Sequence, residues 1–490
     1  MNRFGALERG VRISHSMVGI LWCAAFLAGL GLARLEPNIS SSWAVILLVW
    51  AMVLRRRFRL AYILLAMTSM LLVGIWRGEG FMQRMAPYSQ LADRKVTLVA
   101  KVDTDAVYGK QKQLSFIVRS VSFEAPMRAT PPGAIKVNGF GELAIYKGDV
   151  VRVEGKLRQT RGSNQAAIYF AQIQRVGSST NLVNDTVRRF TAGVQTALPE
   201  PAASFGMGLL IGQRTTLPQE QLDALKMVGL MHIVAVSGYN LTIIIGFAKR
   251  MLQKRSKRMT MLVAVSLMVL FLACTGMSAS IVRASVVSGL GLMAWYVGRK
   301  VRPTLLILLA AALTAGVYPV YVWSDVGWYL SFLAFYGILV LAPLVFDRFW
   351  RQRTPHVLTA VAVETLCAEL MTLPLLLYVF GQFSTVGLLA NVLVVIFIPL
   401  AMALTFVAGL AGWLVPAVAG WLAWPAYILL TYMLDIAKLL SSLPRVFTTG
   451  AYIRLPDMIA LYGILFGLVY ILTRRKAWHA LWYNFYAKTK

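Results

Sequence analysis

The chain has 490 residues, of which 58% are hydrophobic and only 14% are charged, and its formal net charge is +29. A soluble protein of this length needs more polar surface to cover its core, so the composition excludes an ordinary soluble globular protein. Part of the excess of Lys and Arg fits the cytoplasmic loops of a membrane protein. Another part fits a surface that binds an anionic polymer or acidic lipids, and composition alone does not show how large each part is.

The N-terminal part contains continuous apolar runs. About 20 apolar residues in a helix cross the roughly 30 Å of a bilayer core with every backbone group bonded internally. Three such helices are predicted at about 14–34, 43–54 and 59–76. The positive-inside rule places the basic loop at 55–59 in the cytoplasm, so the third helix ends outside, at about Trp76.

A region without spanning segments follows, from Ser89 to Gly177. Short alternating stretches predict strands at 96–102, 114–119, 141–145, 149–155 and 167–171, separated by turn signals such as Pro131-Pro132-Gly133. Five short strands of this kind favour a small β-barrel, and an OB-fold is the leading candidate. By the topology of the preceding helices, this barrel faces outside.

The predicted barrel is basic, with 14 Lys or Arg against 7 Asp or Glu, a net charge of +7. The positive-inside rule does not explain basic residues on an external domain, whereas basic grooves with stacking aromatics hold single strands without sequence preference. Alternatively, the aromatics fill the core and the charge faces lipid headgroups, and strand alternation predicts that at least half of the aromatics are core. These aromatics are Tyr108, Phe116, Phe140, Tyr146, Tyr169 and Phe170. The candidates for external DNA binding are Lys101, Tyr108, Lys110, Lys112, Arg119, Lys147, Arg152, Lys156, Arg158, Arg161 and Tyr169.

Residues 181–198 repeat apolar side chains at helical spacing, among them Val187, Phe190 and Val194. The pattern fits an interfacial amphipathic helix and, equally, a linker helix packed on the protein. The segment at 199–227 is apolar only in part and is a candidate re-entrant segment.

The second half is a dense series of apolar segments. Spans are predicted at about 228–247, 259–275, 281–298, 303–323, 327–346, 356–380, 386–411, 415–440 and 456–473, which makes about twelve in all. Basic clusters at 249–258, 299–302, 348–353 and 474–476 all fall on the cytoplasmic side if the barrel is outside. Because the chain changes sides with each crossing, the same count places both termini in the cytoplasm. The expected fold is therefore a polytopic α-helical membrane protein with an inserted extracytoplasmic barrel.

Polar residues inside apolar segments are costly in a bilayer and usually face a bundle interior or a watery path. His232, Ser237 and Asn240 fall within about two turns, and Gly238 permits close approach. Interhelical hydrogen bonding is the plainer explanation. Arg283 needs a partner if it is buried, and Glu364 and Glu369 are the acidic candidates, either as a stabilising ion pair or as part of a polar conduit.

The motifs of several enzyme classes are missing. No G-x-x-x-x-G-K-[ST] loop and no H-E-x-x-H motif occurs, and the four histidines lie in distant segments. No cofactor or metal is therefore expected, and the chain is not expected to be an enzyme.

Several stretches resemble the ComEC family of competence proteins, the inner-membrane channels for DNA uptake. They are Gly212-Gln213-Arg214 with residues 229–241, residues 276–284, residues 326–334, and Leu373-Pro374-Leu375 through Phe380-Gly381, Ser384 and Leu389-Ala390-Asn391 to Pro399-Leu400. The N-terminal helices with an external barrel also match the family's usual N-terminal half. The resemblance implies a channel whose candidate path residues are His232, Ser237, Gly238, Asn240, Arg283, Glu364, Glu369 and Asn391.

Two departures from that family stand out. Asn240 occupies a position where the family often has histidine, which puts any role needing protonation there in doubt. Many members also carry a C-terminal metallo-β-lactamase-like nuclease domain, and no such segment follows the last predicted helix here.

The expected organisation is N-terminal helices at 1–80, the OB-like domain at 81–180, the interfacial helix or linker at 181–204, the channel domain at 205–475 and a basic cytoplasmic tail at 476–490. The resemblance implies import of single-stranded DNA across the cytoplasmic membrane. The expected partners are this DNA, membrane lipids, a cytoplasmic helicase-like motor, an external DNA receptor and further copies of the chain. The alternative is a transporter or flippase for another anionic polymer or lipid.

Overall fold

The computed structural model describes residues 15–35, 42–54, 59–108, 113–141, 145–160, 162, 164–178, 182–213, 217–234, 238–276, 279–299, 302–350 and 355–474. The predictions for Lys110, Lys112, Arg161, Ser237 and the tail at 476–490 lie outside these residues. The chain divides into two compact units, residues 1–181 with 299–328, and residues 182–298 with 329–490.

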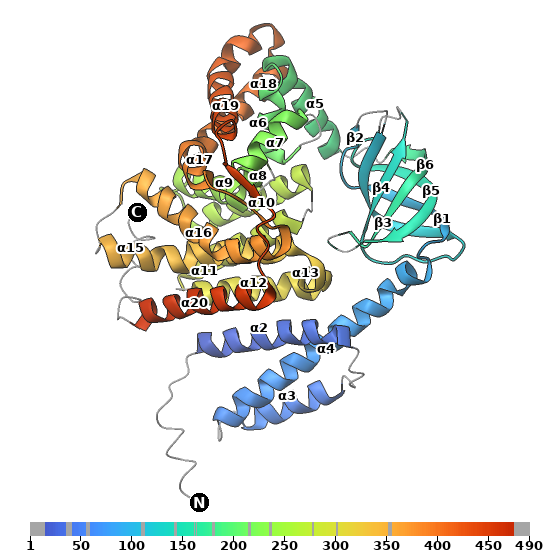
Figure 1. The fold of residues 1–490 in the computed structure, drawn as a ribbon, viewed down its shortest axis with the longest axis vertical. Helices are drawn as coiled ribbons and strands as arrows, with labels where there is room; N and C mark the ends of the chain where they lie inside the picture. The colour runs from blue at the N-terminus through green and yellow to red at the C-terminus, as the bar shows by residue number, and fades with distance from the viewer. Residues whose placement is uncertain are drawn as a thin grey trace, which may run out of the picture. The chain divides into compact units, whose positions relative to one another are not determined.

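The first unit holds the barrel and a small set of helices (Figure 1). Its helices are α2 (His15–Leu32), η1 (Ala33–Leu35), α3 (Ser42–Leu54), α4 (Arg59–Gln90), α12 (Pro303–Val317) and α13 (Val320–Ser324). Its strands are β1 (Lys95–Val102), β2 (Val107–Tyr108), β3 (Gln113–Ala125), β4 (Ala134–Phe140), β5 (Asp149–Gln159) and β6 (Ala166–Ser178).

The second unit is helical apart from one pair of short strands. Its N-terminal helices are α5 (Leu182–Ala197), α6 (Ala202–Ile211), α7 (Gln219–Met227), α8 (Met231–Val234), α9 (Gly238–Met251), α10 (Lys257–Thr275) and α11 (Ala279–Val297). After α14 (Val326–Tyr336), which crosses the boundary between the units, come a π-helical turn (Gly337–Leu341), α15 (Ala342–Trp350), α16 (Val357–Phe380), β7 (Gln382–Ser384), α17 (Gly387–Val394), η4 (Val395–Phe397), α18 (Ile398–Leu414), η5 (Pro416–Val418), α19 (Ala419–Ser441), β8 (Phe447–Thr449) and α20 (Leu455–Arg474).

Nine helices within the described residues are long and apolar enough to cross a membrane, and three shorter apolar helices accompany them. They indicate a polytopic helical membrane protein. Two predicted spans are divided in the structure, because 303–323 forms α12 and α13, and 386–411 forms α17, η4 and α18. Residues 235–237 of the predicted span at 228–247 lie outside the described residues.

Helix α4 continues to Gln90, so the prediction that it ends at about Trp76 was wrong. The polar last turns of α4 remain helical because their side chains pack against the segment after α12 and against the barrel. Phe81 lies edge-on to Tyr318 with ring centroids 5.2 Å apart, and Tyr88 packs on Phe123 of the barrel at 5.9 Å. Partial burial also raises the pKa of Tyr318, which keeps this phenol neutral.

Three further hydrogen bonds join α12 and α13 to the rest of the first unit. Trp323 Nε1 donates to the Leu30 carbonyl at 2.7 Å, and Arg77 Nε donates to the Gly316 carbonyl at 2.9 Å. The Ser324 hydroxyl donates to the Gly162 carbonyl in the β5–β6 turn at 3.1 Å. The ends of α2 and α12 therefore lie beside α4 near Arg77, and α13 contacts the β5–β6 turn of the barrel.

Five long strands close into a barrel, and the two-residue β2 extends one edge (Figure 1). The neighbours run β1–β5–β6–β4–β3 and return to β1, with β4 and β6 parallel and the other pairs antiparallel. Alternate side chains fill the interior, including Leu98, Phe116, Ile135, Val153 and Ile168. The strand predicted at 141–145 falls mostly on residues 142–144, which lie outside the described residues. The strand that follows β3 is formed by residues 134–140, directly after Pro131-Pro132-Gly133, and was not predicted.

The second unit packs through unusually close helix contacts. In α5, a β-carbon at Gly193 would lie 2.5 Å from the Gly409 carbonyl oxygen of α18, and one at Gly412 would collide with the Gly193 carbonyl. Small residues let the two backbones approach to this extent. Phe190 also packs on Phe406, with ring centroids 5.7 Å apart. Of the two interpretations of residues 181–198, the structure therefore supports a helix packed on the protein.

Candidate functional site

The predicted span at 356–380 forms α16, whereas the predicted span at 386–411 is divided into α17, η4 and α18. Helix α16 ends at Gly381 with a left-handed backbone (φ +58°), and the chain then runs through β7, which pairs with β8. A new short helix, α17, begins at Gly387, and a 3-10 turn separates it from α18. A β-carbon at Gly387 would lie 3.1 Å from Glu369 Oε1.

The position of Glu369 shows how deep this break lies. Phe380 follows Glu369 by 11 positions in α16, which is about 16 Å of helix. Because Gly387 meets the Glu369 carboxylate, the chain after Gly381 runs back along α16, and α17 begins beside the middle of that helix. Non-helical backbone at such a depth is typical of protein-lined or water-lined sites in membrane proteins.

Polar groups gather around this break. Asn391 Nδ2 donates to Glu369 Oε1 at 3.3 Å. The Ser384 hydroxyl is buried and has no hydrogen-bond partner among the described residues. An unsatisfied buried hydroxyl is costly, which makes this a place where a ligand group or water would be stabilised.

A third chain segment reaches the same place. A β-carbon at Gly229 would lie 3.5 Å from Ser384 Cβ and 3.6 Å from the Gly387 α-carbon, and its φ of +76° favours glycine. The Gly229 carbonyl is 3.0 Å from Nδ1 of His232, which is exposed. We call these residues the broken-helix cluster: Gly229, His232, Glu369, Ser384, Gly387 and Asn391.

Other predicted path residues lie elsewhere in the second unit. Asn240 is 1% exposed, and its Nδ2 donates to the Leu209 carbonyl of α6 at 2.7 Å, so it bonds two helices together. A β-carbon at Gly238 would lie 2.9 Å from Ala284 Cβ, next to Arg283, which is 4% exposed. Glu364 is half-buried and points about 140° away from Glu369 around α16.

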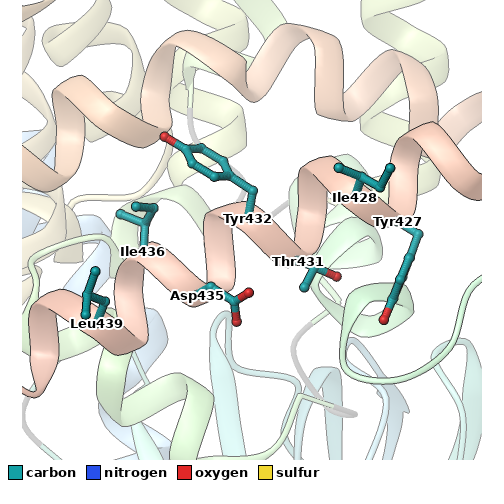
Figure 2. Close-up of a pocket in the computed structure, with 7 residues that line it drawn as sticks. All are labelled: Tyr427, Ile428, Thr431, Tyr432, Asp435, Ile436 and Leu439. Carbon is teal, nitrogen blue, oxygen red and sulfur yellow. The ribbon is translucent and has the colours of Figure 1, made fainter.

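One face of α19 forms a depression of about 580 Å³, and none of the predicted site residues lines it (Figure 2). The lining residues recur at helical spacing and are Tyr427, Ile428, Thr431, Tyr432, Asp435, Ile436 and Leu439. Near the end of the same helix, Lys438 Nζ is 3.3 Å from Glu220 of α7, and both side chains are exposed. One carboxylate on an open face supplies no constellation for catalysis.

On the barrel, several basic residues that were predicted to bind DNA form ion pairs, which partly neutralise their positive charge. Ion pairs join Arg119 to Asp103 at 2.7 Å, Arg152 to Glu124 at 3.2 Å and Lys156 to Asp93 at 3.4 Å. The pairs of Arg152 and Lys156 are exposed, so they are weak and a competing polyanion can replace the carboxylates. Lys101 is exposed, and the side chain of Tyr108 lies outside the described residues.

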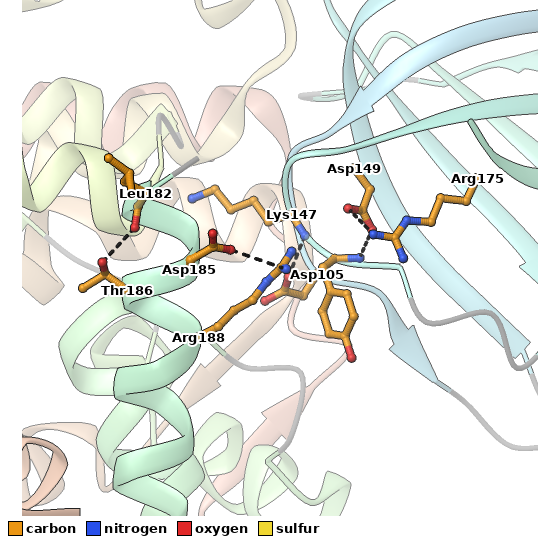
Figure 3. Close-up of polar contacts among 9 residues, drawn as sticks. Asp105, Lys147, Asp149, Arg175, Leu182, Asp185, Thr186 and Arg188 are labelled. Atoms are coloured by element: carbon orange, nitrogen blue, oxygen red, sulfur yellow. Dashed lines mark hydrogen bonds and ion pairs between the residues drawn. The ribbon is translucent and has the colours of Figure 1, made fainter. Parts of the chain in front are cut away.

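Lys147 belongs to a turn that fixes the start of β5. Its backbone N–H donates to Asp105 Oδ1 at 2.8 Å, and the fully buried Asp149 next to it pairs with Arg175 at 3.1 Å (Figure 3). The conformation of this turn is thus held by buried carboxylate contacts. On helix α5, the same figure shows the Thr186 hydroxyl donating to the Leu182 carbonyl and Asp185 beside Arg188.

The barrel aromatics differ from the prediction that at least half of them are core. Phe116 is buried, whereas Phe140, Tyr146, Tyr169 and Phe170 are exposed. Arg158 lies over the ring of Tyr169, with its Cζ 5.9 Å from the centroid. The rings of Phe140 and Phe170 stack with centroids 5.8 Å apart. In β6 the alternation fails at Phe170, where the strand carries a bulge.

Sequence reasoning found Glu369, Asn391 and His232 but missed Gly229, Ser384 and Gly387 as site residues. The run from Phe380 to Ser384 gave a signal, since glycine and polar residues between apolar segments predict an interruption. Their meeting with Gly229, more than 150 positions away in the chain, has no local signature.

Comparison with known proteins relates this chain to a described family. A family model described as "Competence protein" matches residues 209–476, which is more than half of the chain and contains the whole broken-helix cluster. The chain belongs to the competence protein family. This competence protein is also 26% identical over 297 residues to "ComE operon protein 3" of Bacillus subtilis (strain 168), a match that covers 59% of the chain. The match spans 35% of that relative's length. No solved structure matches the chain.

Proposed function

We propose that this competence-family protein is a channel that imports single-stranded DNA across the cytoplasmic membrane during natural transformation. The observation that carries the proposal is the broken-helix cluster, which lies inside the region matched by the family model. Irregular backbone in the middle of apolar helices is tolerated where it is buried in protein or lines a path. The family's association with competence supplies the substrate.

The chemistry of the cluster suits a polyanion in transit. The N-terminus of α17 directs its unpaired backbone N–H groups and positive dipole end at the cluster, where an anionic group is stabilised. Asn391 and Ser384 add an amide and a hydroxyl, which contact phosphate without reading sequence. Glu369 occupies this position in the absence of an anion and prevents it from binding phosphate too tightly.

We further propose that the barrel is an OB-fold on the outer side of the membrane, where it engages incoming DNA. Its closed five-stranded arrangement, with non-sequential neighbours β1–β5 and β4–β6, fits the Greek-key barrel of that fold. The proposed sidedness is supported by contacts within each unit. The ends of α2 and α12 lie together beside α4, and β7 pairs with β8. Each of these groups joins segments that the basic clusters predict on the same side of the membrane.

The channel itself is proposed to perform no catalysis, because the sequence holds no nucleotide-binding motif. A cytoplasmic helicase-like motor or the proton gradient would then drive movement. An external DNA receptor and further copies of the chain remain the proposed partners, alongside membrane lipids.

The test is uptake of fluorescently labelled DNA by a strain lacking the gene, complemented with the wild-type chain or with Glu369→Ala. We expect no internal label in the deletion strain, recovery with the wild type, and poor recovery with the variant at equal membrane levels. Normal DNA uptake by the deletion strain would refute the channel proposal. It would leave the alternative, a transporter of another anionic polymer or lipid.

A further inference from the structure

Strand β6 contains an extra residue at a place where both of its neighbours are regular. Against β4, Val137 pairs with Ile168 and Gly139 pairs with Ala171. Against β5, Glu154 pairs with Gln172 and Lys156 pairs with Tyr169, and a second register shift follows between Val150 and Val151. In each of the two pairings with Tyr169 and Phe170, two residue steps of the neighbour match three steps of β6, which locates a bulge at these two residues.

The bulge turns two consecutive rings outward. Ile168 and Ala171 point into the barrel, whereas Tyr169 is 44% exposed and Phe170 is 79% exposed. Phe170 has a φ of +55°, a left-handed conformation that is rare and costly for a bulky side chain. Strained backbone of this kind persists where the surrounding structure enforces it, and it concentrates at functional sites.

Glycines on both flanking strands make room for the bulge. A β-carbon at Gly139 would lie 2.7 Å from the Ala171 carbonyl oxygen, and one at Gly155 would lie 2.5 Å from Ile168 Cγ2. The distortion is therefore accommodated by β4 and β5 and is not confined to β6 itself.

The exposed rings form an ordered surface. Phe140, which is 53% exposed, stacks on Phe170 at an interplanar angle of 28°. Arg158 covers Tyr169 immediately beside this pair. The barrel as a whole carries 14 Lys or Arg against 7 Asp or Glu, so an anionic partner is favoured.

The stacked rings and Arg158 differ in their distance from the helices. Strand β4 begins at Ala134, beside the β5–β6 turn where Gly162 contacts α13, and its six steps place Phe140 about 20 Å from that turn. Arg158 is closer to the helices, because the backbone of its neighbour Leu157 bonds to Asp93 and Arg94, directly after α4. A flat aromatic pair near an arginine matches the stacking platforms of single-strand-binding surfaces.

We infer that the outer face of Phe170, backed by Phe140, stacks on a nucleobase of single-stranded DNA, while Arg158 contacts the adjacent phosphate. The inference rests on the proposed function and adds the residues through which the barrel holds the strand. Stacking on a ring face recognises any base, so this contact is independent of sequence.

The experiment uses the full chain in nanodiscs of zwitterionic lipid and two labelled oligonucleotides of equal length, oligo-dT and its abasic counterpart. We expect Phe170→Ala to weaken binding of oligo-dT about tenfold and to leave binding of the abasic strand unchanged. Phe170→Trp restores affinity, and Tyr146→Ala, which removes another exposed barrel aromatic, has little effect. Arg158→Ala weakens binding of both strands and lowers the slope of affinity against salt by about 1.

Three outcomes would overturn the inference. The first is wild-type affinity in Phe170→Ala, and the second is an equal loss for oligo-dT and the abasic strand. The third is a loss that Phe170→Trp does not restore. If the wild-type chain itself binds neither oligonucleotide, the failure belongs to the proposed DNA-binding role of the barrel.

Discussion

The barrel and the broken-helix cluster are both built around an interruption of regular secondary structure, but the two interruptions face different surroundings. In β6 an extra residue turns aromatic rings outward, and glycines of neighbouring strands accommodate it. Between α16 and α17 the chain folds back, and it turns a carboxylate, an amide and a hydroxyl inward. Aromatic rings that are exposed to water can stack on a nucleobase, whereas polar groups that point inward can line a path through an apolar bundle.

On the proposed function, the first unit binds a strand before it enters and the second unit holds its polar path, so binding and passage are expected to be separable. Variants in one unit should therefore leave the property assigned to the other unchanged.

The largest effect is expected from Gly412→Leu. Any β-carbon there collides with the Gly193 carbonyl, so α5 and α18 must separate, at a cost of about 3 kcal/mol or more. We expect a clear fall in thermal stability in detergent and loss of transformation. Gly463→Leu on α20 is the control, because a β-carbon there meets no atom within 4 Å. Equal stability of the two variants would contradict the close helix contact.

The second largest effect is expected from Glu369→Ala. It removes the acceptor of the Asn391 amide and leaves that group unsatisfied, which costs about 1–3 kcal/mol. We expect transformation frequency to fall by about tenfold or more while affinity for oligo-dT stays at the wild-type value. Glu369→Gln keeps an acceptor oxygen and should retain more activity. Glu364→Ala, on another face of α16, is the matched control, and a comparable loss there would remove the special role of Glu369.

Gly155→Ala tests the other interruption. The added methyl meets Ile168 and compresses the bulge, with an overpacking cost of about 1–3 kcal/mol. We expect affinity of the full chain for oligo-dT to fall several-fold. Gly177→Ala on β6, where a β-carbon meets open space, should bind as the wild type does. A bulge that plays no part in binding would leave the two variants indistinguishable.

The smallest effect is expected from the ion pair between Lys438 and Glu220. Both side chains are largely exposed, so the pair contributes at most about 1 kcal/mol. Glu220→Gln should leave both stability and transformation close to the wild type, measured by thermal unfolding and colony counts. A large loss would indicate that the contact between α7 and α19 takes part in passage.

The sequence by itself determined the membrane character and much of the organisation. Long apolar runs predict spanning helices because lipid requires every backbone group to be bonded internally, and alternating stretches between turn residues predicted four of the five barrel strands. It also singled out Glu369 and Asn391, since polar side chains within apolar segments are costly and rarely accidental.

Tertiary structure alone decided which distant segments meet at the interruptions, where α4 ends and where β6 bulges. Helix α4 extends beyond its apolar stretch because Phe81 packs on Tyr318 and Tyr88 packs on Phe123. The meeting of Gly229 with Ser384 and the outward turn of Phe170 depend on neighbouring segments that fill or vacate space around them. Local pattern encodes which face of an element is apolar, and only packing against distant residues fixes where the element must bend or break.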